Sequence, residues 1–186
     1  MNILRPVNVL EECILLNWSS LLIGWNNNWL TKQDIINYAV KWLQNNPMET
    51  NEAIILLSGA EQYDDDEIRR LLLGIIEKKQ LIDEATEIDK WRLAHLIILS
   101  QENIDPEKKI VRLEELYAEF GYPADMRLCS RYGPSQKAIK NGLASSSELS
   151  IDPVDEMERV IMRLKKRFGV KITEERSRVD TREKLK

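Results

Sequence analysis

The fold is decided by residues 83–102, which read DEATEIDKWRLAHLIILSQE. Apolar residues recur here every three or four positions, and this spacing places them on one face of an α-helix. The inner face of this helix is expected to carry Ile88, Trp91, Ile98 and Leu99. This is the longest helix that the sequence predicts, and it favours an all-helical interpretation of the chain.

The rest of the chain has the same spacing of apolar residues, and strand-like alternation is almost absent. About seven helices are expected, bounded by turn and capping signals, over residues 8–23, 31–45, 51–62, 64–79, 83–102, 105–120 and 152–168. The first of them is expected to run unbroken, with Ile14 available for burial. The fold class is therefore all-α, a compact irregular multi-helix bundle, with a short solenoid of helix pairs as the alternative.

Two of the expected helices share their start and stop signals. Residues 105–106 and 152–153 are both Asp-Pro, which pairs an N-cap residue with a proline at the first helical position. Residues 120–121 and 168–169 are both Phe-Gly, and glycine is the usual residue after a helix end. The likeness indicates either an internal repeat or the independent use of the same helix start and stop signals.

Turn signals from Gly, Pro, Asn and Ser are crowded into residues 121–150. We therefore divide the chain into a helical domain over residues 1–135, a loop or linker over 136–150, and a C-terminal helix with a charged tail over 151–186. The C-terminal helix is expected to pack on the first domain after the long loop.

Charge is distributed unevenly between the two parts of the chain. Residues 1–120 contain 12 basic and 21 acidic residues, whereas residues 121–186 contain 15 basic and 10 acidic residues. An acidic body repels nucleic acid and attracts basic proteins. The sequence pI of about 5.3 and the mixed signs of the C-terminal tail also argue against a nucleic-acid partner. Alternatively, the basic C-terminal part folds back onto the acidic body.

Several features favour a cytoplasmic protein without a membrane partner. No stretch approaches the roughly 18 apolar residues that cross a bilayer. The N-terminal residues do not have the pattern of a signal peptide. Cys13 and Cys129 are the only cysteines, and they are expected to be reduced thiols rather than a disulfide framework.

Candidate catalytic residues are few. The single histidine, His95, lies on or beside the buried stripe, and we expect it to be a half-buried residue bonded to a carboxylate or carbonyl. Cys129 precedes Ser130 and Arg131, and a nearby arginine would lower the pKa of a thiol, so a Cys–His couple is the catalytic alternative. Phosphate-cradling loops and metal-ligand spacings are absent, so we predict no cofactor, no metal and no catalytic residues.

Two groups of residues are candidates for binding a protein partner. Asp64, Asp65, Asp66 and Glu67 form a run of acidic residues, here called the acidic cluster. The cluster is expected to steer a basic partner, and the alternative is a solvated helix start with no function. Trp25 and Trp29 flank three asparagines and are expected to be the most exposed tryptophans. Tryptophan is enriched at interfaces, while packing in the core is the alternative.

Three segments resemble domain-of-unknown-function family 2247, an uncharacterised bacterial group. They are TKQDI at residues 31–35, EIDKWRLAHL at 87–96, and LYAEFGYPADM at 116–126 followed by CSRY at 129–132. The resemblance covers about residues 10–135, and residues after 140 lie outside it. Proteins of this kind look like immunity proteins found beside secreted bacterial toxins. The resemblance implies no catalytic residues.

Three functional hypotheses follow. The first is an immunity or antitoxin protein that neutralises a basic toxin domain by occluding it. The second is a helical scaffold or regulatory adaptor that binds a peptide or helix in a groove. The third is an enzyme of unknown class that uses His95 or Cys129.

Overall fold

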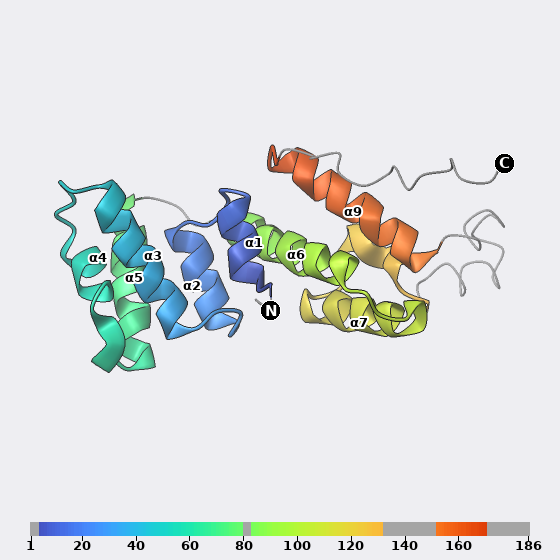
Figure 1. The fold of residues 1–186 in the computed structure, drawn as a ribbon, viewed down its shortest axis with the longest axis horizontal. Coiled ribbons are helices and arrows are strands. Elements are labelled where there is room, and N and C mark those ends of the chain that lie inside the picture. Colours follow the sequence, from blue (N-terminus) through green and yellow to red (C-terminus); the bar gives the residue numbers. More distant parts are fainter. Residues whose placement is uncertain (1–3, 80–82, 132–151, 171–186) are drawn as a thin grey trace, which may run out of the picture.

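The computed structural model describes residues 4–79, 83–131 and 152–170, and every regular element in these ranges is helical (Figure 1). The all-α class is therefore confirmed. The longer helices are α1 (Pro6–Glu12), α2 (Trp18–Asn26), α3 (Lys32–Asn45), α5 (Asp65–Lys79), α6 (Glu84–Gln101), α7 (Pro106–Glu119) and α9 (Pro153–Arg167). The shorter elements are α4 (Glu52–Leu57) and the 3-10 helices η1 (Ala60–Gln62) and η2 (Ala124–Cys129).

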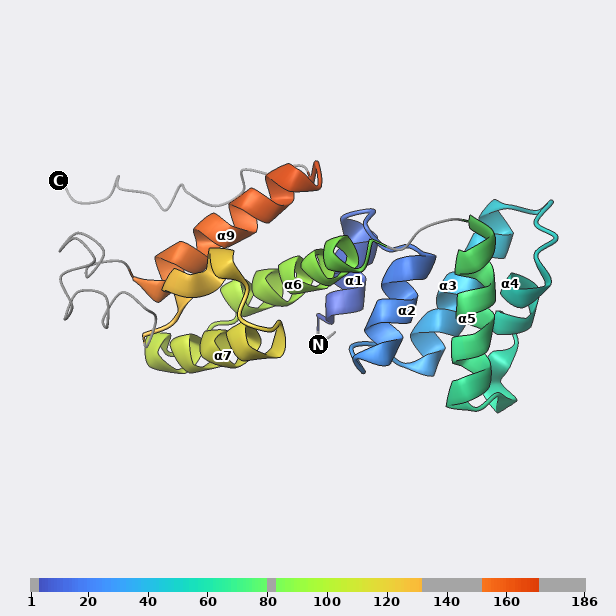
Figure 2. The same ribbon diagram turned by 180° about the vertical axis from the view of Figure 1, so that it is seen from behind.

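The helices form an irregular bundle that is longer in one direction than in the others (Figures 1 and 2). Helices α3, α4 and α5 lie at one end, and α7, η2 and α9 lie at the other. Helix α2 packs against both α5 and α6, and α6 in turn contacts α1, α7 and α9. Helix α6 is thus the central element to which both ends of the molecule are attached.

Helix α6 is more deeply buried than one apolar stripe predicts. Trp91 and Leu99 are buried as expected, while Ile88 and Ile98 are partly buried against the core. Residues that the sequence did not place on the inner face, among them Leu93, Ala94 and Leu96, are also buried. A helix with neighbours on several sides has no single outer face, and this explains the difference.

Helix α2 lies very close to α6 at Gly24. A Cβ atom added at Gly24 of α2 would lie 2.9 Å from Trp91 Cε2 and 2.8 Å from Leu30 Cδ2, which is too close for a real contact. The indole Nε1 of Trp91 donates a hydrogen bond to the carbonyl of Ser20 at 2.9 Å. Glycine therefore allows the indole to lie directly against the backbone of α2.

The prediction of one helix over residues 8–23 is wrong. Helix α1 ends at Glu12, and α2 begins at Trp18 after an N-cap at Asn17, whose side chain accepts from the Ser20 amide at 2.8 Å. Between them, Ile14 adopts a left-handed conformation with φ 58°. Its side chain is 92% exposed rather than buried. Asn17 was a capping signal that the apolar spacing obscured.

The helix expected over residues 51–62 is also interrupted. Helix α4 ends at Leu57, and the 3-10 helix η1 follows the break at Gly59. The N-cap of α4 is Asn51, whose side chain accepts from the Ala53 amide at 3.1 Å.

Other start and stop signals are confirmed. The side chains of Asp105 and Asp152 cap α7 and α9 by accepting backbone N–H groups at 2.9 and 2.8 Å. Gly121 and Gly169 follow these helices with φ values of 72° and 65°. At the start of α3, the Asp34 carboxylate accepts from the Thr31 amide at 2.6 Å.

Helix α9 belongs to the same core as the rest of the molecule. It packs on α6, α7 and η2. Its buried apolar side chains are Met157, Val160, Ile161 and Leu164. The expected packing of the C-terminal helix on the first domain is thus confirmed, while the predicted linker (136–150) and the tail beyond 170 lie outside the described residues.

Candidate functional site

The acidic cluster lies at the start of α5, and two of its members are used to cap that helix. The Glu67 amide donates to the Asp64 carboxylate at 2.8 Å, and the Asp64 amide donates to the Glu67 carboxylate at 3.1 Å. This reciprocal pair satisfies two N–H groups at the helix start. Asp65 and Asp66 are exposed, and no described side chain is paired with them.

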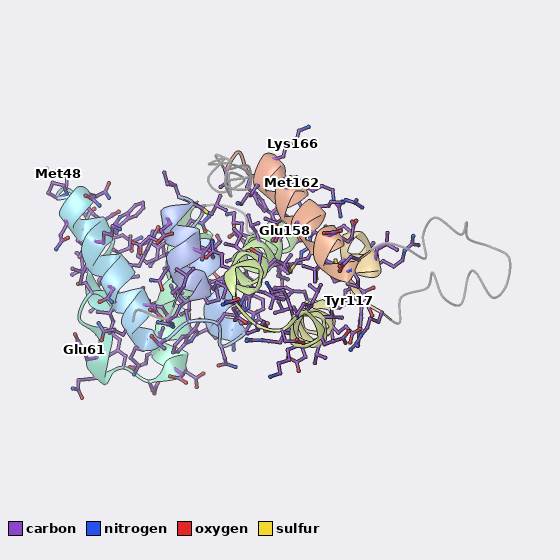
Figure 3. The ribbon with its side chains drawn as sticks, turned by 45° about the vertical axis from the view of Figure 1, so that its right-hand side comes forward. Met48, Glu61, Tyr117, Glu158, Met162 and Lys166 are labelled. Carbon is purple, nitrogen blue, oxygen red and sulfur yellow. The ribbon has the colours of Figure 1, made fainter. Side chains whose placement is uncertain are left out.

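The cationic side chains of α9 do not cover the acidic cluster. Helix α5 lies at the opposite end of the molecule from α9, and Figure 3 shows Glu61, just before α5, far from Lys166. Arg163 of α9 instead pairs with Glu156 at 2.9 Å, and Arg167 pairs with Asp89 of α6. Arg163 and Arg167 of α9 therefore pair with neighbouring carboxylates and not with the acidic cluster.

The two candidate tryptophans are not exposed anchors. Both are partly buried and pack against the core. The ring of Trp29 lies 5.1 Å from that of Phe120 and 5.5 Å from that of Trp91, and its Nε1 donates to the Glu119 carboxylate at 2.6 Å. Trp29 therefore contributes to attaching α7 to the core.

The segment around Trp29 does lie near the acidic cluster, although the indole points inward. The Lys32 ammonium, three residues after Trp29, donates to the carbonyl of Tyr63, the residue before the cluster. The turn between α2 and α3 is thus brought to the start of α5. The sequence did not predict this proximity, because the two segments are 31 residues apart.

His95 lies in an aromatic pocket rather than in a polar site. Its ring is 5.6 Å from that of Trp29 and 5.5 Å from that of Phe120. Its Nε2 atom is buried and has no hydrogen-bond partner among the described residues, contrary to the expected bond to a carboxylate or carbonyl. Burial lowers the pKa of His95, an effect that the nearby Glu119 carboxylate opposes. The imidazole is therefore held in its neutral form.

Cys129 is not placed as a reactive thiol. The side chain is fully buried in η2, and burial, reinforced by Glu156 and Asp125, raises its pKa to about 12. The neighbouring Arg131, which was expected to lower this pKa, pairs instead with Glu107 at 2.8 Å. Because the nucleophile is a thiolate, this environment disfavours covalent catalysis by Cys129.

A buried polar network, which the sequence did not predict, joins α6 to α2. The Glu87 carboxylate accepts from the Ser20 hydroxyl at 2.5 Å, from the Lys90 ammonium at 2.7 Å and from the Asn17 amide at 3.3 Å. Glu87 is only 6% exposed. Its position four residues before Trp91 on the apolar stripe was the signal that could have found it.

A second network joins α6 to η2 and α9. The Arg92 guanidinium, 3% exposed, donates to the Asp89 carboxylate at 2.7 Å and to the Asp125 carboxylate at 3.2 Å. Arg167 of α9 also pairs with Asp89, and Arg163 donates to the Asp125 carbonyl at 3.0 Å. These charged residues of α6 therefore hold helices in place.

The described part of the chain comprises residues 4–79, 83–131 and 152–170. In these ranges, no group of three His, Cys, Asp or Glu side chains is arranged to hold a metal ion. None of the helices there has both the length and the apolar character that crossing a membrane requires.

Two of the segments that resemble a known family contribute to the buried contacts described above. EIDKWRLAHL supplies both buried networks, and LYAEFGYPADM supplies the stacking partner of Trp29 and the carboxylate that binds Arg92. No curated protein and no solved structure matches the chain. A family described as uncharacterised proteins conserved in bacteria does match, over residues 8–168, so the match includes α9, which the sequence resemblance left out. The chain belongs to domain-of-unknown-function family 2247.

Proposed function

We propose that this protein is a non-catalytic protein-binding module of the bacterial cytoplasm that acts as an immunity protein. In this role it binds a basic toxin domain and occludes the surface with which the toxin meets its substrate. The observation that carries the proposal is the exposed pair Asp65 and Asp66 at the end of the molecule away from α9. Toxins that act on nucleic acid need basic surfaces, and complementary charge speeds the encounter and selects the partner.

The local pairing of the α9 arginines supports the proposal. Because Arg163 and Arg167 are bound to nearby carboxylates, they do not neutralise the acidic cluster. Asp65 and Asp66 are exposed, so their field extends into solvent, where it falls off over about 8 Å at physiological salt. The exposed Arg69 and Arg70, one turn further along α5, offset part of this field. A basic protein that approaches this end of the molecule is attracted electrostatically before the two proteins touch.

The experiment is co-expression of the chain with the products of the neighbouring bacterial genes, followed by co-purification. Recovery of a basic toxin domain is expected. The association rate of the purified pair is then measured by surface plasmon resonance at low and high salt. The double variant Asp65→Asn, Asp66→Asn is expected to lower the association rate by about tenfold at low salt, with a smaller effect on dissociation.

The matched control is the double variant Glu115→Gln, Glu158→Gln, which removes the same charge from exposed sites on α7 and α9. Figure 3 shows Glu158 on α9. The control is expected to change the association rate much less than the cluster variant. Failure to recover any toxin domain, or equal effects of the two double variants, would contradict the proposal.

A further inference from the structure

The turn between α1 and α2 places an isoleucine where glycine is the usual residue. The Ile14 amide donates to the Glu11 carbonyl at 3.0 Å, and the Leu15 amide donates to the Leu10 carbonyl at 2.8 Å. These two hydrogen bonds and the left-handed Ile14 form the common ending of a helix known as the Schellman motif.

Helices α7 and α9 end in the same motif but use glycine. Gly121 and Gly169 occupy the left-handed position, and the amide after each closes the motif with a hydrogen bond of 2.9 Å. A β-branched residue is sterically disfavoured in this conformation. Ile14 is also 92% exposed, so its side chain gains almost nothing from burial within its own chain. Both features are unfavourable in a single copy of the protein.

Ile14 projects between two hollows in the surface. The larger, with a volume of about 670 Å³, lies between α1, α6 and α9. Its apolar wall consists of Leu4, Val9, Leu15, Ile97, Phe168 and Val170. The smaller, with a volume of about 260 Å³, lies against α3 and is lined by Leu16, Tyr38 and Trp42. An apolar projection and apolar hollows therefore lie side by side on one face.

The charges around Ile14 are of both signs. Glu11 and Lys41 line the smaller hollow and form an ion pair, while Glu12 and Lys165 line the larger one. The two acidic and two basic residues balance, so the face has no net charge that would favour a strongly basic or a strongly acidic partner. A second copy of the same face, turned by a two-fold rotation, can place its acidic residues near the basic residues of the first.

We propose that this face is the interface of a two-fold symmetric homodimer, in which Ile14 of each copy enters a hollow beside Ile14 of the other. Such an interface must be complementary to itself, and a projection next to a hollow with mixed charges meets that requirement. Burial of Ile14 in the dimer offsets the unfavourable conformation. Helix α5 lies away from α1, so the dimer leaves the acidic cluster accessible. The dimer is therefore proposed independently of the immunity function.

The test is sedimentation velocity of the full chain over a wide range of protein concentration. The wild type is expected to show a reversible monomer–dimer equilibrium. Ile14→Gly removes the projection and suits the left-handed conformation, so it is expected to raise the dimer dissociation constant at least about tenfold. Ile14→Asn, which also tolerates this conformation, is expected to act in the same direction.

The matched control is Tyr122→Gly, because Tyr122 is 65% exposed, has a left-handed conformation like that of Ile14 with φ 60°, and follows α7, which lines neither hollow. It is expected to dimerise like the wild type. Circular dichroism should show unchanged helix content for all variants, and the melting midpoint of dilute Ile14→Gly should be no lower than that of the wild type. A wild type that stays monomeric, an Ile14→Gly variant that dimerises equally well, or a lower midpoint for that dilute variant would overturn the proposal.

Discussion

At the scale of single residues, the acidic Glu87 is buried like its apolar neighbours on α6. It lies between α6 and α2, where Ser20, Lys90 and Asn17 all donate to its carboxylate. The Lys90 side chain is 12% exposed and, among the described residues, pairs only with Glu87. Removal of the carboxylate would leave a nearly buried ammonium group without a counter-charge.

We expect Glu87→Ala to lower the free energy of unfolding by about 3 kcal/mol, the usual cost of breaking a buried pair. Urea denaturation followed by circular dichroism measures the change. Glu115→Ala, at an exposed position on α7, is the control and is expected to change stability by less than about 0.5 kcal/mol. Similar losses for the two variants would show that the Glu87 network does not stabilise the fold.

His95 is expected to make the stability of the protein depend on pH. Burial lowers its pKa in the folded state, whereas histidine in an unfolded chain titrates near about pH 6.5. When the pH falls, the unfolded state therefore binds the proton first. The contribution of His95 to stability is complete above about pH 6.5 and decreases as the pH falls from there towards the lower pKa of the folded state.

The variant His95→Phe tests this dependence. Phenylalanine keeps an aromatic ring between Trp29 and Phe120 and removes both the titrating group and the unpartnered Nε2. Urea denaturation should show that the free energy of unfolding of the wild type falls from about pH 7.5 to about pH 5.5. The fall is expected to be smaller in the variant. The same pH dependence in both proteins would exclude His95 as its source.

At the scale of helices, two glycines are expected to respond in opposite ways to the same substitution. A Cβ atom at Gly24 would collide with Trp91 and Leu30 at the contact between α2 and α6. A Cβ atom at Gly74, within α5, would have no atom within 4 Å. Alanine normally stabilises a helix relative to glycine, so only the packing distinguishes the two sites.

We therefore expect Gly24→Ala to lower the free energy of unfolding by about 2 kcal/mol through overpacking. Gly74→Ala is expected to raise it by about 0.5 kcal/mol. Thermal and urea denaturation of the two variants measure both effects, and each serves as the control for the other. A stabilising Gly24→Ala would mean that α2 and α6 do not approach as closely as described.

At the scale of the whole molecule, α9 completes the core. Its four buried apolar side chains, Met157, Val160, Ile161 and Leu164, each stabilise the fold by about 2 kcal/mol. The net stability of a typical domain is only about 5–15 kcal/mol, so the loss of these four buried side chains is expected to be large on that scale.

A chain that ends at residue 150 is therefore expected to lose its cooperative unfolding transition. A chain that ends at Val170 keeps all the described contacts and is the control. Circular dichroism and tryptophan fluorescence during heating distinguish the two, because Trp29 and Trp91 lie against the central part of the core. Cooperative unfolding of the shorter chain with an unchanged midpoint would show that α9 is dispensable.

The candidate site was partly predictable at this scale. The run of acidic residues indicated a helix start, and α5 does begin there, with Asp64 and Glu67 capping it. The position of Trp29 was not predictable, because its neighbour Phe120 comes from a distant segment. Nor was the exposure of Ile14, since its apolar character alone suggested burial.

The sequence alone determined that the chain is helical and, for most helices, where they begin and end. Apolar spacing, N-caps and terminal glycines act within about four residues, so they can be recognised in the sequence without knowledge of the fold. The tertiary structure alone decided which helices meet. Ser20 and Glu87 are 67 residues apart, and Trp29 and Glu119 are 90 apart, yet each pair is hydrogen-bonded. Only close packing of complementary helix surfaces brings such residues together, and no local signal records it.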